Sequence, residues 1–330
     1  MRETTSTFPA SDGTAVFVRR WDPEEGTPVR AVAHVVHGMA EHSGRYARLA
    51  EALTTSGYVV YAHDHRGHGK TAAPGDLGHL GEQGWSRAVG DLRRLLLEEM
   101  AAHAGLPFVL IAHSMGSFMA QELMFELSDR LTAVALSGSN GKPPPLAAAG
   151  RLVARAERLR LGPRGLSPVL SALSFEAFNK RFAPTRTPSD WLSRDAAEVD
   201  AYEADPLCGF PCSTTTWVEL LDALAFISAP ERQRRIRKDL PVYVAVGAED
   251  AACDMGKGVR QLIGAYRAAG LRDVTERFYP GARHEILNET NREEVTRELI
   301  AWLDGAIARG ARPRPDAAGG AQRASTTPTP

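Results

Sequence analysis

The sequence predicts an α/β fold in which a mostly parallel central sheet is covered by helices on both faces. The first observation is an alternation of apolar runs with helical periods along the chain. The second is that the apolar runs are continuous, which is typical of strands buried on both faces. Strands are expected near residues 31–36, 58–62, 107–112 and 131–137, and helices over 46–55, 85–102 and 116–127. The chain of 330 residues, 43% of them hydrophobic, can bury one large core together with a cap.

The start, the middle and the end of the chain add to this alternation. Asp12-Gly13 predicts a hairpin turn between two short opening strands. Between Ser139 and Asp239 a long insert rich in proline, arginine and aromatic residues interrupts the pattern, which resumes at 241 and ends with a helix over about 290–308. The predicted organisation is a first part of the core at 1–139, an inserted helical cap at 140–239, a second part of the core at 240–308 and a disordered tail at 309–330.

The segment Ala112-His113-Ser114-Met115-Gly116 is the strongest functional signal in the chain. It follows a buried strand and opens a helix, as a nucleophile elbow requires. A serine in such a turn presents its hydroxyl at the carboxyl end of the sheet, next to helix amides that can receive negative charge. Ala112 stands where the usual G-x-S-x-G pattern has its first glycine, so a chance strand-to-helix serine is the alternative interpretation.

A base for this serine is predicted from the order of the chain. In this architecture the acid and then the histidine follow the serine. Of the ten histidines only His284 lies after Ser114, in a turn-rich loop that follows the strand-like run 274–279. An exposed loop histidine is the alternative. A serine that needs a base favours the catalytic interpretation.

The acid is expected at the end of the preceding strand. The apolar run 240–247 leads into Ala248-Glu249-Asp250, and Asp250 is the predicted acid. Spacing alone leaves Glu249 and Asp254 as alternatives. The role of the acid would be to hold the imidazole in the tautomer that accepts the serine proton.

Two backbone amides are expected to form an oxyanion hole. One belongs to Met115, the residue after the serine, and the other to Met39, which follows the strand at 31–36 in His37-Gly38-Met39. An ordinary loop start is the alternative for His37-Gly38. The mechanism that follows is a two-step acyl transfer through an acyl-enzyme.

Several motifs together resemble the monoacylglycerol lipase and lysophospholipase group of α/β-hydrolases, which is also labelled serine aminopeptidase S33-like. The resemblance covers roughly residues 5 to 305. The motifs are His37 to Tyr46, Ala62 to Gly69, His113 to Gly116, Leu192 to Asp195, Val199 to Tyr202, Asp205 to Leu207 and Glu249 to Asp254.

This resemblance implies an α/β-hydrolase fold and a serine esterase, with Ser114 as nucleophile, Asp250 as acid, His284 as base and the amides of Met39 and Met115 as oxyanion donors. It further implies that Glu41, Arg45 and Tyr202 form the polar end of the pocket, where the lipases of the group place a glycerol moiety. Glu41 and Arg45 stand four apart at the start of a helix, so a surface ion pair is an equally good interpretation.

The favoured substrate is a monoacylglycerol or a lysophospholipid, and three alternatives stay open. An S33-type aminopeptidase would need a carboxylate cluster, for which the cap offers Glu198, Asp200, Glu203 and Asp205. An inactive ligand-binding member and acyl transfer to an alcohol other than water are the others. The apolar cap residues could line an acyl groove or pack the cap helices: Leu166, Val169, Leu170, Leu173, Phe175, Phe178 and Phe182.

Composition and spacing give no reason to expect a cofactor, a metal or a nucleic acid. The net charge is −1, and the loop with His63, His65 and His68 around Asp64 does not match a zinc pattern. Three cysteines fit a reducing compartment. No apolar stretch approaches a membrane span, and the first ten residues lack the layout of a signal peptide, so a cytoplasmic location is expected. Transient contact of the cap with a membrane surface is compatible with this expectation, and the oligomeric state is not predicted.

Overall fold

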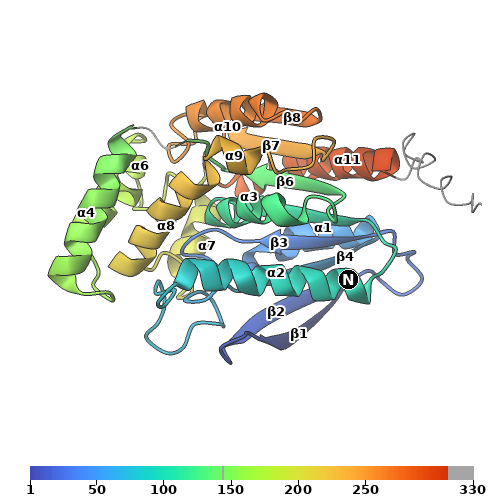
Figure 1. Ribbon diagram of the computed structural model, residues 1–330, viewed down its shortest axis with the longest axis horizontal. Coiled ribbons are helices and arrows are strands. Elements are labelled where there is room, and N and C mark those ends of the chain that lie inside the picture. Colours follow the sequence, from blue (N-terminus) through green and yellow to red (C-terminus); the bar gives the residue numbers. More distant parts are fainter. Residues whose placement is uncertain (143–144, 311–330) are drawn as a thin grey trace, which may run out of the picture.

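The computed structural model describes residues 1–142 and 145–310, and these contain an eight-stranded sheet in the order β1-β2-β4-β3-β5-β6-β7-β8 (Figure 1). β1 (Arg2–Pro9) and β2 (Ala15–Asp22) form the predicted antiparallel hairpin. β2 also pairs antiparallel with β4, and all the remaining pairs are parallel. The other strands are β3 (Ala31–Val36), β4 (Tyr58–His63), β5 (Phe108–His113), β6 (Ala133–Ser137), β7 (Val242–Gly247) and β8 (Val274–Tyr279). The predicted α/β class is confirmed.

Helices cover both faces of the sheet. β3 to β7 are buried along almost their whole length, as the continuous apolar runs predicted. One face packs in a large apolar cluster with three helices, α2 (Gly84–Ala102), α3 (Met115–Leu127) and α10 (Lys257–Ala268). The other face packs with α1 (Ala47–Thr55), which follows the short 3-10 helix η1 (Ser43–Tyr46), and with α11 (Arg292–Gly310). Of the predicted tail, residues 309 and 310 belong to α11, and 311–330 lie outside the described residues.

The insert between β6 and β7 is helical. It contains α4 (Pro145–Leu161), α5 (Pro168–Leu173), α6 (Phe175–Lys180), α7 (Ala196–Ala204), α8 (Thr214–Ile227) and α9 (Pro230–Gln233). α4 stands at the far end of the molecule and packs on α8 (Figure 1). α8 itself packs on α2 and α3, and it contributes Leu220, Ala223 and Ile227 to the larger core. The insert is therefore anchored to the sheet through α8, while α4 lies furthest from it.

Candidate active site

The turn between β5 and α3 has the backbone of a nucleophile elbow. Ser114 has φ 49° and ψ −122°, a conformation that L-residues rarely adopt and that is held here between a strand and a helix. Gly116 is required because a methyl group on it would lie 2.4 Å from the carbonyl oxygen of His37. Ala112, the departure from the glycine pattern, is buried in the larger core cluster, so its methyl group is packed with other apolar groups.

The structure brings Ser114, His284 and Asp250 together, although 34 residues separate the last two in sequence and 170 separate the first two. His284 Nε2 lies 3.0 Å from Ser114 Oγ. Its Nδ1 lies 2.8 Å from Asp250 Oδ2. The imidazole therefore bridges the hydroxyl and the carboxylate, which is the arrangement that activation of a serine nucleophile by a histidine base requires.

The acid alternatives are separated by their burial. Asp250 is fully buried, whereas Glu249 and Asp254 are exposed. Asp250 Oδ1 also accepts the backbone N–H groups of Ala252 at 2.9 Å and of Cys253 at 3.2 Å. These donors fix the carboxylate. Of the three candidate acids, Asp250 is the one that contacts His284.

The two buried partners perturb each other's ionisation. Burial alone would raise the pKa of Asp250, but the charge of His284 and the hydrogen bonds keep that pKa below its usual value. Burial alone would lower the pKa of His284, but Asp250 raises this pKa above its usual value. Asp250 is therefore an anion next to an imidazole that can hold a proton as a cation.

The loop that carries Met39 lies beside the serine. A methyl group on Gly38 would stand 3.2 Å from Ser114 Cβ, so the loop backbone touches the elbow. Met115 is the first residue of α3, where backbone N–H groups have no partner within the helix. Within residues 1–142 and 145–310, no protein group accepts a hydrogen bond from the amide of Met39 or of Met115. Both predicted oxyanion donors are therefore unpaired within the described residues.

The family described as serine aminopeptidase, S33, matches residues 27–291 of this chain. The chain belongs to this family. It is 29% identical over 304 residues to the monoacylglycerol lipase of Mycolicibacterium smegmatis, covering 90% of this chain and 95% of that protein. It is 30% identical over 299 residues to the human monoglyceride lipase, covering 89% of this chain and 88% of that protein. Among solved structures it is similar to a highly thermostable carboxyl esterase from Bacillus coagulans in complex with glycerol, with a TM-score of 0.85, 27% identity and coverage of 93% of this chain and 99% of that chain.

Membership of the S33 family confirms two predictions made from the motifs. The fold is that of an α/β-hydrolase. The protein is a carboxylic ester hydrolase of the monoacylglycerol lipase type.

The three residues predicted for the polar end of the S33 pocket also converge. Glu41 Oε1 accepts the Gly38 N–H at 2.6 Å, and its Oε2 accepts from Arg45 at 2.9 Å. The Tyr202 hydroxyl donates to the carbonyl oxygen of Ala40 at 2.9 Å, and the Arg45 guanidinium lies 4.9 Å from the centre of the Tyr202 ring. The Glu41–Arg45 ion pair expected from the spacing exists, but Glu41 is buried and the Arg45 side chain is only 11% exposed, so the pair is not a surface pair.

Glu285 is a second acid of this cluster that the sequence analysis did not identify. It binds Arg45 in a bidentate pair with N–O distances of 2.6 and 2.7 Å. Burial would raise the pKa of Glu285, but Arg45 lowers it to about 2. The pKa of Glu41, in contrast, is raised by its burial. The position of Glu285, directly after the predicted base, was the one available signal.

Trp191, which forms an apolar wall next to His284 together with phenylalanines of the cap, was also missed. The ring of Trp191 lies 5.0 Å from the ring of His284, and it stacks on Phe175 at 5.7 Å. Phe178 packs against the same tryptophan at 5.3 Å. Of the seven apolar cap residues singled out from the sequence, these two phenylalanines and Phe182 join this cluster, while Leu170 is buried in another. Leu166, Val169 and Leu173 are exposed.

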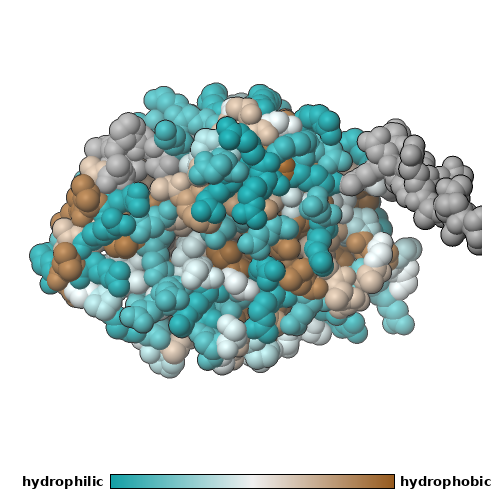
Figure 2. Space-filling model, viewed as in Figure 1, coloured by the Kyte–Doolittle hydropathy of each residue, from teal (hydrophilic) through white to brown (hydrophobic). Residues whose placement is uncertain are grey.

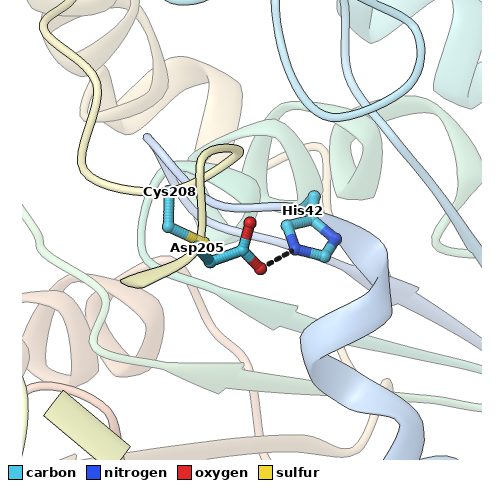
Figure 3. A group of neighbouring side chains, drawn as sticks. All are labelled: His42, Asp205 and Cys208. Atoms are coloured by element: carbon cyan, nitrogen blue, oxygen red, sulfur yellow. Dashed lines mark hydrogen bonds and ion pairs between the residues drawn. The ribbon is translucent and has the colours of Figure 1, made fainter. Parts of the chain in front are cut away.

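Two groups of side chains in the described part of the chain place metal-ligating atoms near one another. One is Asp250, Cys253 and His284, where the acid and base already bond each other. The other is His42, Asp205 and Cys208 (Figure 3). The Gly44 N–H donates to His42 Nδ1 at 3.1 Å, so the ring proton is on Nε2 and is donated to Asp205 at 2.9 Å. A metal on Nε2 would need that proton moved to Nδ1, at the cost of the Gly44 bond. We therefore interpret this group as a hydrogen-bonded pair beside a cysteine.

Proposed function

We propose that this ester hydrolase cleaves monoacylglycerols, with Ser114 as nucleophile, His284 as general base and Asp250 as the acid that orients it. The observation that carries the proposal is the buried His284 ring, which bridges Ser114 Oγ and Asp250 Oδ2. The names of the relatives, a monoacylglycerol lipase and a monoglyceride lipase, support the substrate class.

The reaction proceeds in two steps. His284 Nε2 takes the proton of Ser114 as Oγ forms a bond to the ester carbonyl carbon. The amides of Met39 and Met115 donate to the oxygen that becomes negative. The ester C–O bond then breaks, and His284 returns the proton to the leaving alcohol. Water attacks the acyl-enzyme by the same route and releases the carboxylic acid and free Ser114.

The charge balance at the polar end favours a glycerol over a phosphate headgroup. Arg45 is the cation that lies there, and it already pairs with Glu285 and with Glu41. A phosphate would have to compete with two carboxylates for the same guanidinium, whereas neutral hydroxyl groups do not. A lysophospholipid is therefore the second substrate to test, after a monoacylglycerol.

The aminopeptidase alternative finds little support in the cap. An amine-binding site would need several carboxylates directed to one place, but three of the four on and after α7 pair with different partners. Glu198 binds Arg48 at 2.8 Å, Asp200 pairs with Arg186, and Asp205 binds His42. These carboxylates therefore bind partners in different parts of the protein and do not form a cluster beside Ser114.

The test is hydrolysis of long-chain monoacylglycerols, lysophospholipids, short p-nitrophenyl esters and aminoacyl anilides by the wild type and by Ser114→Ala. We expect turnover of monoacylglycerols that disappears in the variant. Turnover of the anilides alone would move the assignment to a peptidase, and full esterase turnover in Ser114→Ala would refute the nucleophile. A fluorophosphonate probe distinguishes an active hydrolase from an inactive ligand-binding protein, because an unactivated serine would not be labelled.

We also propose that the cap touches the membrane that supplies the lipid. Five large apolar side chains on and near α4 and α5 are exposed: Leu152, Leu159, Leu166, Val169 and Leu173. Figure 2 shows apolar surface at the end of the molecule where α4 lies. Leu159 is 89% exposed, which is unfavourable in water and favourable against lipid. In the described residues no helix has the length and apolarity to cross a bilayer, so the contact would be peripheral.

Vesicle binding tests the cap proposal. Leu159→Ser should weaken co-sedimentation with phosphatidylcholine vesicles and leave hydrolysis of a soluble short ester unchanged. Val29→Ser is the matched control, because Val29 is an exposed apolar residue outside the cap. Equal binding by the wild type and both variants would contradict the proposal. The cytoplasmic location remains a prediction from the sequence.

A further inference from the structure

A row of buried histidines connects α2 to the loop that carries Met39. Glu99 Oε2 lies 2.8 Å from His34 Nδ1, and His34 Nε2 lies 3.0 Å from His63 Nδ1. His63 Nε2 lies 3.0 Å from His65 Nδ1, and His65 Nε2 lies 3.0 Å from the carbonyl oxygen of His37. All five side chains are buried. The row contributes no group to the acyl-transfer steps described above.

The number of protons in this row follows from its two ends. Both ends are oxygens, a carboxyl group of Glu99 and a carbonyl group of His37, and four hydrogen bonds join them through three rings. Four bonds need four protons, but three neutral imidazoles supply only three. The fourth proton is therefore either on Glu99, as a carboxylic acid, or on one ring, as an imidazolium.

The surroundings of Glu99 favour its carboxylic acid form. Within the described residues only His34 hydrogen-bonds to the Glu99 carboxyl group, so few donors stabilise its anion. Burial raises the pKa of Glu99. Burial also lowers the pKa of His63 and of His65 well below the usual value. With the proton on Glu99, the carboxyl group donates to His34 Nδ1, and the Nε2–H group of each ring donates to the next acceptor in the row.

The far end of the row holds His37 at two points. The His65 ring donates to the His37 carbonyl oxygen, and the His65 backbone N–H donates to His37 Nε2 at 3.0 Å. The remaining ring proton of His37 is therefore on Nδ1, which lies 2.8 Å from the carbonyl oxygen of Gly38. That oxygen belongs to the same peptide unit as the Met39 N–H, and in a trans peptide the two point in opposite directions. Fixing the Gly38 oxygen fixes the direction of the Met39 amide.

We propose that Glu99, His34, His63 and His65 are positioning residues for ester hydrolysis, which form a neutral row of hydrogen bonds with one direction and thereby aim the Met39 amide. This inference rests on the proposed function, in which Met39 stabilises the oxyanion. A row with one direction suits this task because no ring can turn over without breaking its bonds to both neighbours.

The tautomers are measured first, on the wild-type enzyme. Nitrogen-15 labelling of the histidines, with long-range proton–nitrogen spectra at neutral pH, distinguishes the two neutral tautomers and the imidazolium. We expect His34, His63 and His65 as Nε2–H tautomers and His37 as the Nδ1–H tautomer, with signals assigned by single substitutions. An imidazolium or an Nδ1–H tautomer at any of the three would overturn the proposal. This measurement needs no turnover, so its result is independent of whether the proposed function is correct.

The positioning role is then measured by a matched pair of variants. In Glu99→Gln the amide still donates an N–H to His34 Nδ1, and we expect the kcat and KM of the wild type. Glu99→Leu leaves that nitrogen without a donor, and we expect kcat about tenfold lower with KM unchanged, a smaller loss than the removal of a whole oxyanion donor. Rates are normalised to the Ser114 content titrated to completion with a fluorophosphonate. A fall in kcat with Glu99→Gln as large as with Glu99→Leu would overturn the inference, because it would mean an ionised Glu99.

A control distinguishes positioning from loss of stability. Tyr58 lies at the opposite end of β4 from His63, and its hydroxyl donates to Asp304 at 2.6 Å. Tyr58→Phe should lower the melting temperature and leave kcat unchanged. If Glu99→Leu behaves in the same way, the row is only structural and the proposal is wrong. An inactive wild type would instead refute the proposed function, while the tautomer result would still stand.

Discussion

Two buried histidine–carboxylate pairs lie within residues 1–142 and 145–310, and the pKa of the carboxyl group is shifted in opposite directions in the two pairs. His284 with Asp250 and His34 with Glu99 have the same N–O distance of 2.8 Å, and all four side chains are buried. The pKa of Asp250 is lowered, whereas burial raises the pKa of Glu99. Distance and burial alone therefore do not determine where the proton resides.

The difference comes from what else each carboxyl group contacts. Asp250 accepts two backbone N–H groups on the oxygen that does not face His284. Glu99 bonds only to His34 among the described residues, and the next group along is another imidazole. Backbone donors stabilise an anion and so make Asp250 a partner for an imidazolium. Without them, Glu99 retains its proton and the histidines beyond it remain neutral.

The largest expected effect comes from Asp250→Asn, which makes the first pair resemble the second. An amide cannot hold His284 in the tautomer that accepts the Ser114 proton, nor stabilise the imidazolium. We expect kcat for ester hydrolysis to fall by about 10⁴-fold. Steady-state kinetics on a soluble ester measures this, with folding checked by circular dichroism. A loss of less than tenfold would show that the two pairs do not differ in function.

A smaller effect is expected on stability when the second pair is broken. Glu99→Leu leaves His34 Nδ1 buried without a partner, so the free energy of unfolding should fall by about 1–3 kcal/mol. Glu99→Gln retains a donor, and its loss should be under about 1 kcal/mol. Urea unfolding of the three proteins gives both values. Equal losses for the two variants would mean that the charge of Glu99, and not its proton, supports the row.

The first pair could be predicted from sequence and the second was missed, although both leave local signals. Only one histidine follows Ser114, and Asp250 follows a buried strand, so chain order restricted the choice. Glu99 falls on the same apolar stripe of α2 as Leu92 and Leu96, where an acid must be buried. Its partner His34 lies 65 residues away in sequence, on strand β3. Nothing in the spacing of the two residues links them.

The same difference between local sequence patterns and contacts of distant residues explains which other features could be predicted. The central strands and the helices that cover them were predicted because each leaves a local pattern, a continuous apolar run for a strand and an apolar stripe for a helix. Trp191 and Glu285 were missed because their contacts with His284 and Arg45 depend on how the cap and the loop after β8 fold over the site. The exposure of Leu166 next to the burial of Leu170 depends in the same way on packing.

The pH dependence of turnover reports the ionisation of the first pair. Asp250 raises the pKa of His284, and the base must be neutral to accept a proton, so kcat/KM should fall tenfold per pH unit below that raised pKa. The midpoint of this acid limb should lie above about 6.5, the usual histidine value. His63 and His65 should add no limb, because burial lowers the pKa of each well below its usual value. A single midpoint below 6.5 in the profile of kcat/KM would contradict the ion pair at His284.

The smallest effect is expected from Glu285→Gln, which removes a negative charge near His284 without touching the triad. The charge of Glu285 contributes to the raised pKa of His284, after that of Asp250. Its removal should move the midpoint of the acid limb to lower pH by less than about one unit. The variant also loses its charged pair with Arg45, so midpoints and not absolute rates are compared. A shift to higher pH would have the wrong sign for a lost negative charge. It would mean that freeing Arg45 places a positive charge closer to Glu41 or to Asp250 and changes the base indirectly.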